Sequence, residues 1–282
     1  MAKTNALKVL FWALFCVFIT IFVSETFNKF YGAGPDPEII TDWMKSVMVF
    51  SLCSVYLFWS IGPKKATVFL VITLSISFLL EFIGITAGYP IGVTYSYDDS
   101  FSPLNIFGLP VTVPINWAII NILGYSIITH MLTLSGRSKP NADSKKISIV
   151  LLIVLDALVV TAMDVILDPL KVAQGSWTWM EGGPFYGIPI GNYIGWFVVA
   201  AISIGAFRLI EYKRPGEEKI LRGNMSVMPS VIYMFIAGYL CISALDIGMP
   251  DLALIGILAT FPLPLANMAL HFRVSRKATD KR

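Results

Sequence analysis

Residues 156–196 read DALVVTAMDVILDPLKVAQGSWTWMEGGPFYGIPIGNYIGW. It begins as an apolar helix that carries three carboxylates, Asp156, Asp164 and Asp168. The Asp168-Pro169 pair predicts a break in that helix. A loop rich in Gly and Trp follows, and a second apolar helix starts at about Asn192. Carboxylates are rare and costly inside a membrane helix, so this stretch is a candidate functional site.

The composition of the whole chain is that of an integral membrane protein. Of its 282 residues, 56% are hydrophobic and 14% are charged, whereas soluble domains carry about 25% charged residues. The net charge of +3 is too small to predict a nucleic-acid partner. We therefore predict a multi-pass protein of the cell membrane, with lipid around a single polytopic domain over residues 1–282.

Apolar segments long enough to cross a bilayer, about 20 residues each, occur along the entire chain. The eight segments are residues 7–24, 43–61, 66–86, 112–134, 147–168, 192–210, 227–245 and 251–271. The first follows Lys3 and Lys8, as a signal peptide would, but lacks a small-residue cleavage site, so we expect it to stay as a span. The prediction is an all-α membrane protein with about eight transmembrane helices.

The distribution of basic residues predicts the orientation. If eight spans alternate, only Lys29, Lys45 and Lys171, of 21 Lys and Arg residues, fall opposite the N-terminus. Cytoplasmic loops carry the excess of Lys and Arg, so we expect both termini in the cytoplasm. The long loops after the third and fifth spans, rich in Gly, Pro and aromatic residues, then face outward.

These two loops resemble each other. The corresponding pairs are residues 107–117 (FGLPVTVPINW) with 186–196 (YGIPIGNYIGW), Tyr95–Tyr97 with Trp177–Trp179, and Glu81 with Asp164. Both hairpins run in the same direction, so the pattern predicts a parallel repeat of spans three and four in spans five and six. Membrane hairpins also share Gly, Pro and Trp for generic interfacial reasons, which is the competing explanation.

The carboxylates lie at similar predicted depths. With a rise of ~1.5 Å per residue, Glu81 lies ~22 Å along the third span and Asp164 ~26 Å along the fifth. Asp164 and Asp168 are four residues apart and share a helix face. Asp156, two turns deeper, either joins the same polar seam or faces a neighbouring helix. A carboxyl group in apolar surroundings stays neutral and can donate a proton.

Aromatic residues gather around these carboxylates in the sequence. They are Tyr95, Tyr97, Trp117, Trp177, Trp179, Tyr186 and Trp196. An aromatic face stabilises a nearby cation by ~0.5–2 kcal/mol, so an acid beside such faces suits alkene protonation and a sheltered carbocation. The structural alternatives are that the aromatics form an interfacial belt, that Asp168-Pro169 only ends a helix, and that Glu81 and Asp164 only join two spans.

The remaining polar residues give no further site. His130 and His271 fall at span ends and are expected at the surface, and Asp246 and Asp251 are expected to be solvated. No His, Cys and carboxylate spacing typical of a metal site occurs, so we expect neither a metal nor a cofactor.

Two sets of motifs resemble the membrane carotenoid biosynthesis family, which contains the carotenoid hydratases, bisanhydrobacterioruberin hydratase among them. The second set is Met163–Pro169, Gly175–Trp179, Gly183–Pro189 and Asn192–Trp196. The first set is Glu81–Gly84, Gly88–Gly92, Tyr95–Tyr97 and Gly108–Trp117. The resemblance therefore covers residues 81–196, where we place the catalytic core.

The resemblance implies cofactor-independent addition of water to the terminal isoprenoid double bond of an acyclic carotenoid. The expected roles are proton donor for Asp164 or, second, Glu81; cation binding for Trp177, Trp179 and Tyr186; water orientation for Asp168 or Asn192; and substrate contact for Trp117, Trp196, Tyr95 and Tyr97. Other membrane enzymes of the pathway are expected partners. The alternatives are a transporter or lipid-handling protein with a buried carboxylate site, and a non-catalytic scaffold of a pigment-synthesis complex.

Overall fold

The computed structural model describes residues 2–32, 41–88, 94–98, 101–135, 149–213 and 223–279. Parts of two predictions lie outside these ranges. They are Tyr89–Gly92 of the first motif and the basic residues Arg137, Lys139, Lys145, Lys146, Arg214, Lys219, Arg222, Lys281 and Arg282.

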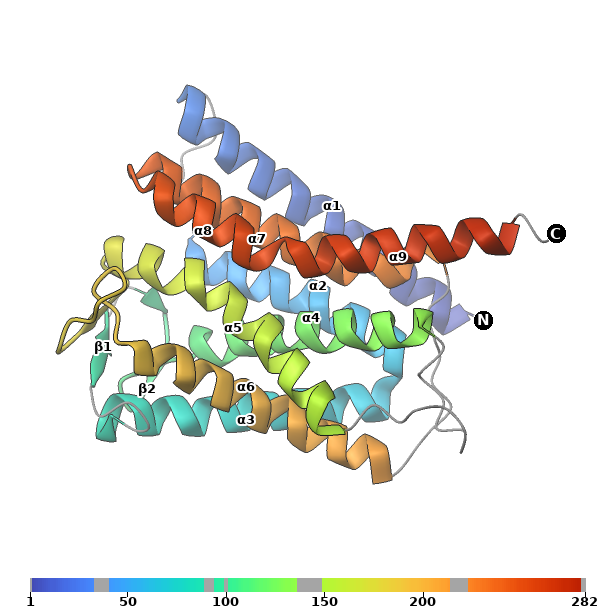
Figure 1. Cartoon of the computed structure of the whole chain (residues 1–282), viewed down its shortest axis with the longest axis horizontal. Helices are drawn as coiled ribbons and strands as arrows, with labels where there is room; N and C mark the ends of the chain where they lie inside the picture. The colour runs from blue at the N-terminus through green and yellow to red at the C-terminus, as the bar shows by residue number, and fades with distance from the viewer. Residues whose placement is uncertain are drawn as a thin grey trace.

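The structure is a bundle of long helices (Figure 1). The helices are α1 (Ala2–Tyr31), α2 (Asp42–Ile61), α3 (Pro63–Ala87), α4 (Thr112–Leu134), α5 (Ile149–Ala173), α6 (Ile190–Lys213), α7 (Met228–Asp246), α8 (Pro250–Thr260) and α9 (Pro262–Thr279). Eight apolar helical segments are long enough to cross a membrane, with α8 and α9 forming the last. This confirms the predicted all-α multi-pass fold. The cytoplasmic location of the termini stays a prediction.

Pro169 does not interrupt its helix as predicted. The expected break at Asp168-Pro169 is wrong, because α5 continues through Pro169 to Ala173. Proline removes one backbone donor, and the next turn still forms, with the Gln174 N–H bonded to Leu170. The predicted span over 251–271 is present as one membrane-length segment, Pro250–Lys277, with an interruption at Phe261, directly before Pro262, where α8 ends and α9 begins.

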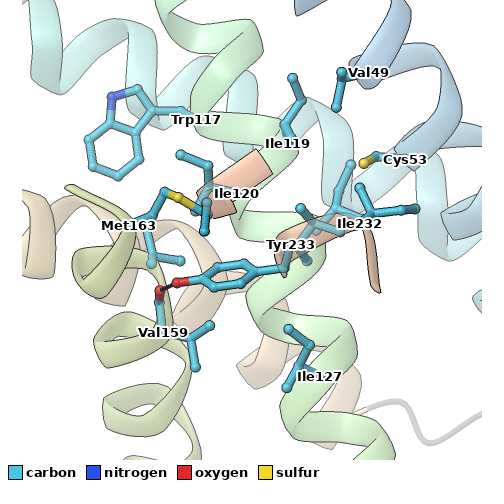
Figure 2. Close-up of a cluster of buried hydrophobic side chains, with 14 of the residues drawn as sticks. Val49, Cys53, Trp117, Ile119, Ile120, Ile127, Val159, Met163, Ile232 and Tyr233 are labelled. Atoms are coloured by element: carbon cyan, nitrogen blue, oxygen red, sulfur yellow. Dashed lines mark hydrogen bonds between the residues drawn. The ribbon is translucent and has the colours of Figure 1, made fainter. Parts of the chain in front are cut away.

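The core of the bundle is built around α4, whose buried side chains run along most of its length. Figure 2 shows α4 residues packed against side chains of α2, α5 and α7, including Val49, Met163 and Ile232. Within this core the Tyr233 hydroxyl of α7 donates a hydrogen bond to the Val159 carbonyl of α5 at 2.8 Å. The buried hydroxyl therefore has a partner, as close packing in an apolar interior requires.

Two short sheets lie together at one end of the bundle, which we call the sheet end (Figure 1). Strand β1 (Tyr95–Tyr97) pairs antiparallel with β4 (Trp177–Trp179), and β2 (Asn105–Ile106) pairs with β3 (Leu109–Pro110). Helix α1 begins and α9 ends at the opposite end. The β1–β4 pairing joins two loops that are about 80 residues apart in the chain.

Corresponding residues of the two hairpins adopt matching geometry. In the β1–β4 register Tyr95 opposes Trp179 and Tyr97 opposes Trp177. The φ angles are 55° at Phe107 and 53° at Tyr186, and 81° at Gly108 and 80° at Gly187. A repeat predicts such matches, because equivalent segments then meet about a common axis; the repeat itself remains a prediction.

Candidate functional site

Glu81 accepts three hydrogen bonds at the sheet end of α3. Its Oε2 accepts from the hydroxyls of Tyr95 and, at 3.0 Å, Tyr97. Its Oε1 accepts from the indole N–H of Trp117 on α4 at 2.7 Å. All three neighbours donate, so the environment fits the ionised carboxylate, which can only accept.

A glycine one turn along α3 makes room for this arrangement. A Cβ atom built on Gly84 would lie 3.0 Å from the Tyr95 hydroxyl oxygen. Strand β1 thus approaches the helix closely enough for both tyrosines to reach Glu81. Burial, and next the neighbouring Glu81 charge, raise the pKa of Tyr95 and Tyr97 well above the usual tyrosine range. Both hydroxyls therefore remain protonated donors.

Asp164 and Asp168 meet at one amide nitrogen. Asn192 Nδ2, near the start of α6, donates to Asp164 Oδ2 at 3.0 Å and to Asp168 Oδ2 at 2.5 Å. The indole N–H of Trp177 on β4 donates to the other oxygen of Asp168. The four-residue spacing places both carboxyl groups on one face of α5, as the sequence predicted, and this face meets Asn192 of α6.

Asp164 differs from the other two carboxyl groups in its hydrogen bonding. It is fully buried, and its Oδ1 has no partner within the described ranges. A buried carboxylate oxygen without a donor is costly. A proton on the Asp164–Asp168 pair removes one of two like charges, which lowers that cost.

Aromatic rings enclose the space between the carboxyl groups. Trp117 stacks on Trp196 with ring centroids 4.1 Å apart. Across the β1–β4 pair, the ring centroids of Tyr95 and Trp179 lie 4.6 Å apart, and those of Tyr97 and Trp177 lie 5.7 Å apart. The stack joins α4 to α6, while the strand pairs cover the sheet-end side.

A cavity of about 40 Å³ lies among these groups. Its lining contains nine of the eleven predicted site residues: Glu81, Tyr95, Tyr97, Trp117, Asp168, Trp177, Trp179, Asn192 and Trp196. We call it the acid cavity. Its volume exceeds the 10–15 Å³ or so that one water molecule needs, so it accommodates a small reacting group.

Two predicted residues do not line the acid cavity. Asp164 lies behind Asn192, which contacts both it and the cavity. Tyr186 is 37% exposed and packs on its neighbour Phe185 with ring centroids 4.9 Å apart. The acid cavity also has four lining residues that the sequence reasoning missed: Phe101, Val113, Asn116 and Leu167. Asn116 directly precedes Trp117, and Leu167 directly precedes Asp168. This adjacency to predicted site residues is the sequence signal that could have identified them.

The deepest carboxylate belongs to a different contact. Asp156 is fully buried and accepts two hydrogen bonds from Arg208 of α6, at 2.6 and 2.8 Å. The Arg208 guanidinium also lies 4.4 Å from the ring centroid of Tyr125. Of the two expectations for Asp156, the structure supports contact with a neighbouring helix.

Both histidines are buried, and the prediction that they lie at the surface is wrong. His130 is 7% and His271 4% exposed, because α9 packs against the end of α4 and brings their rings to 5.3 Å. His130 Nδ1 bonds Asn267 Oδ1 at 2.9 Å, and Asn267 in turn donates to Ser230. Among the residues that the structure describes, no group of three or more His, Cys, Asp or Glu could hold a metal ion.

Comparison with known proteins agrees with the motifs. Residues 41–262 match the family described as carotenoid biosynthesis protein. The chain is 25% identical over 193 residues to bisanhydrobacterioruberin hydratase of Haloarcula japonica, an alignment that covers 68% of this chain and only 61% of that relative's length. No solved structure matches significantly. Because the family match extends over well more than half of the chain, the protein belongs to the carotenoid biosynthesis protein family.

Proposed function

We propose that the protein adds water across the terminal isoprenoid double bond of an acyclic carotenoid, giving a tertiary alcohol. Membership in the carotenoid biosynthesis family supports this proposal, as does the distant relative that is named a hydratase. The observation that carries it is the acid cavity, where two carboxyl groups and several aromatic rings line one small space. Alkene hydration needs a proton, shelter for a cation, and water.

The proton comes from the Asp164–Asp168 pair. Two carboxyl groups share one amide donor here, in apolar surroundings. In such surroundings the pair is more stable with one proton bound than with both groups ionised. Asp168 lines the acid cavity and delivers the proton, and Asp164 behind it shares that proton with its partner. Sequence reasoning favoured Asp164 as the donor; the proposal assigns delivery to Asp168 because it faces the space where the alkene would lie.

The carbocation forms within the aromatic lining. The proton adds to the less substituted alkene carbon, so the positive charge forms on the tertiary carbon. The faces of Trp177 and Trp179 stabilise this charge by ~0.5–2 kcal/mol each. The Glu81 carboxylate, fixed by its three donors, adds a preorganised negative charge without moving.

Water then completes the reaction. Its oxygen bonds to the tertiary carbon, and the proton that it loses returns to the Asp168 carboxylate. Asn192 donates to this carboxylate and so fixes its orientation toward the water. The net reaction is alkene plus water to alcohol; nothing is oxidised or reduced, and the proposed reaction uses no cofactor.

The test is expression in a lycopene-producing host, followed by mass analysis of the pigments. A gain of one water per modified end is expected. Asp168→Asn and Glu81→Gln should each lower conversion roughly a hundredfold or more, the usual contribution of positioned acid–base groups. Asp251→Asn, at an exposed site on α8, is the matched control and should convert normally.

Normal hydration by both acid-cavity variants, each folded in the membrane, would refute the proposal and favour the scaffold alternative. Proton-coupled uptake in vesicles without pigment change would favour a transporter. Asp156, the one carboxylate that lies deep, forms an ion pair with Arg208.

A further inference from the structure

A second cavity, lined mainly by apolar side chains, adjoins the acid cavity. It has a volume of about 130 Å³ and lies between α1, α2, α4, α5 and α7. Its apolar lining residues are Phe22, Val49, Phe101, Ile119, Ile120, Met163, Leu167, Ile236 and Leu240. Figure 2 shows Val49, Ile119, Ile120 and Met163 on the facing sides of α2, α4 and α5. We call this space the chain cavity.

The chain cavity and the acid cavity share part of their walls. Phe101, Asn116 and Leu167 line both. The Phe101 ring also packs against the aromatic rings of the reacting site, with its centroid 6.0 Å from Tyr97 and 5.7 Å from Trp177. The two cavities therefore lie on either side of these three residues, and a molecule that occupied both would pass Phe101.

The size and lining of the chain cavity select its occupant. Apolar cavities of about 150 Å³ in proteins stay dry and bind apolar molecules the size of benzene. The chain cavity is similar in volume, at about 130 Å³, and hydrocarbon side chains form most of its wall. Along the apolar part of the wall, a hydrocarbon chain is therefore a better occupant than water.

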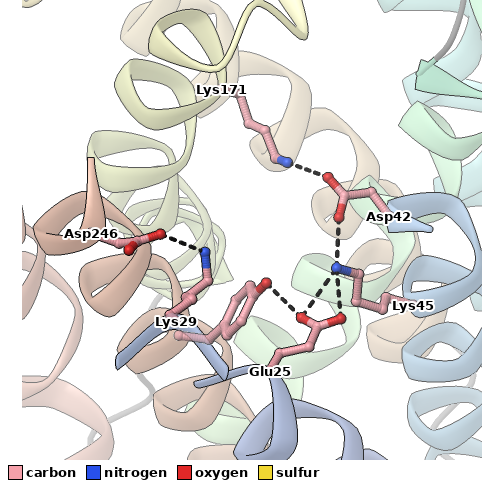
Figure 3. Close-up of polar contacts among 7 residues, drawn as sticks. Glu25, Lys29, Asp42, Lys45, Lys171 and Asp246 are labelled. Atoms are coloured by element: carbon pink, nitrogen blue, oxygen red, sulfur yellow. Dashed lines mark hydrogen bonds and ion pairs between the residues drawn. The ribbon is translucent and has the colours of Figure 1, made fainter. Parts of the chain in front are cut away.

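The charged residues at the sheet end of the chain cavity form ion pairs with one another. Their presence is therefore compatible with a hydrocarbon occupant. The network joins Lys171 to Asp42 (2.6 Å), Asp42 to Lys45 (2.8 Å), Lys45 to Glu25 (3.1 Å) and Lys29 to Asp246 (3.1 Å) (Figure 3). Its three lysines are the three basic residues that the predicted topology places on the side of the membrane opposite the N-terminus. Three positive and three negative charges cancel, and each charged residue among the described lining of the chain cavity has an ion-pair partner.

The network forms a wall of the chain cavity directly. Asp42, Lys45 and Lys171 line the chain cavity and also a polar pocket of about 510 Å³ at the sheet end. On α2 the apolar lining residue Val49 lies one turn beyond Lys45, and on α5 Met163 lies two turns before Lys171. The ion pairs thus stand between the polar pocket and the apolar chain cavity.

We propose that the chain cavity binds the isoprenoid chain segment next to the reacting end, and that Val49 and Ile236 limit which chains fit. This inference rests on the proposed hydration. It adds a binding site for a polyene hydrocarbon in which α1, α2 and α7, from outside the 81–196 core that the motifs define, supply part of the lining.

The test fills the chain cavity from two independent walls. Val49→Phe on α2 and Ile236→Phe on α7 each add volume at a lining position. Val47→Phe is the matched control, since Val47 lies two residues away on the same helix and is 43% exposed. Two quantities are measured in the lycopene-producing host: water gained by the pigment, and pigment retained per mole of purified protein. Thermal unfolding in detergent checks that each variant is folded.

Hydration and pigment retention should both fall roughly tenfold or more in the two filled variants, the usual effect of misfit in an apolar pocket, and stay normal in Val47→Phe. Wild-type levels of both in folded Val49→Phe and Ile236→Phe would overturn the chain cavity while leaving hydration intact. If the wild type retains pigment but hydrates nothing, the proposed function fails. In that case, loss of retention in the filled variants alone would still support the chain cavity.

Discussion

Removing the charge of Asp156 should destabilise the protein without touching its chemistry. Asp156 is fully buried and Arg208 is 5% exposed, with two hydrogen bonds of 2.6 and 2.8 Å between them. Breaking a buried ion pair by removing one partner costs about 3–5 kcal/mol, chiefly because the other charge stays buried and unpaired. Asp156→Asn keeps the shape and one acceptor, so we expect the low end, ~3 kcal/mol.

The assay is thermal unfolding of the purified protein in detergent. At ~2–4 °C per kcal/mol, the Tm of Asp156→Asn should fall by roughly 6–12 °C. Adding Arg208→Gln to it replaces the ion pair with two amides that can bond each other, and should recover most of the loss. Carotenoid conversion per folded molecule at low temperature should equal that of the wild type.

Two results would refute this reasoning. A Tm within about 1 °C of wild type would mean that Arg208 finds another partner and that the pair contributes little. A wild-type Tm together with loss of carotenoid conversion in Asp156→Asn would mean that Asp156 takes part in the reaction. It would then support the alternative that Asp156 belongs to the same polar seam as Asp164 and Asp168.

Two further changes probe single contacts. Gly84→Ala places a Cβ 3.0 Å from the Tyr95 hydroxyl, so Tyr95 should withdraw from Glu81 and conversion should fall roughly tenfold, with Tm nearly unchanged; normal conversion would show that this hydroxyl is dispensable. Tyr233→Phe removes the 2.8 Å hydrogen bond to the Val159 carbonyl and should cost ~1 kcal/mol by thermal unfolding, with conversion unaffected; an unchanged Tm would contradict the contact.

The helical architecture was predictable because it depends on local composition. A run of about 20 apolar residues must form its backbone hydrogen bonds internally within lipid, and a helix does so without reference to the rest of the chain. The eight segments therefore appear at nearly the predicted positions. The differences are at Pro169, where the predicted break is absent, and at Phe261, where the last segment is interrupted between α8 and α9.

The site was predictable as far as its residue types and helix faces. The four-residue spacing of Asp164 and Asp168 fixed their common face, and the matched loops directed attention to Glu81 and Trp117. The sequence could not show that β1 and β4 pair with each other, since that register depends on contact between loops distant in the chain. The same pairing decides which aromatics enclose the acid cavity and leaves Tyr186 outside its lining.

The sequence by itself determined a multi-pass helical protein of the carotenoid biosynthesis family with carboxylates near aromatic rings. Which polar groups are partners became visible only in the folded protein: Asp156 with Arg208, Asp164 with Asp168 through Asn192, and Lys29, Lys45 and Lys171 with three carboxylates. The physical reason is that hydrophobicity acts on each segment separately, whereas hydrogen bonds and ion pairs form only between atoms that packing brings within about 3 Å.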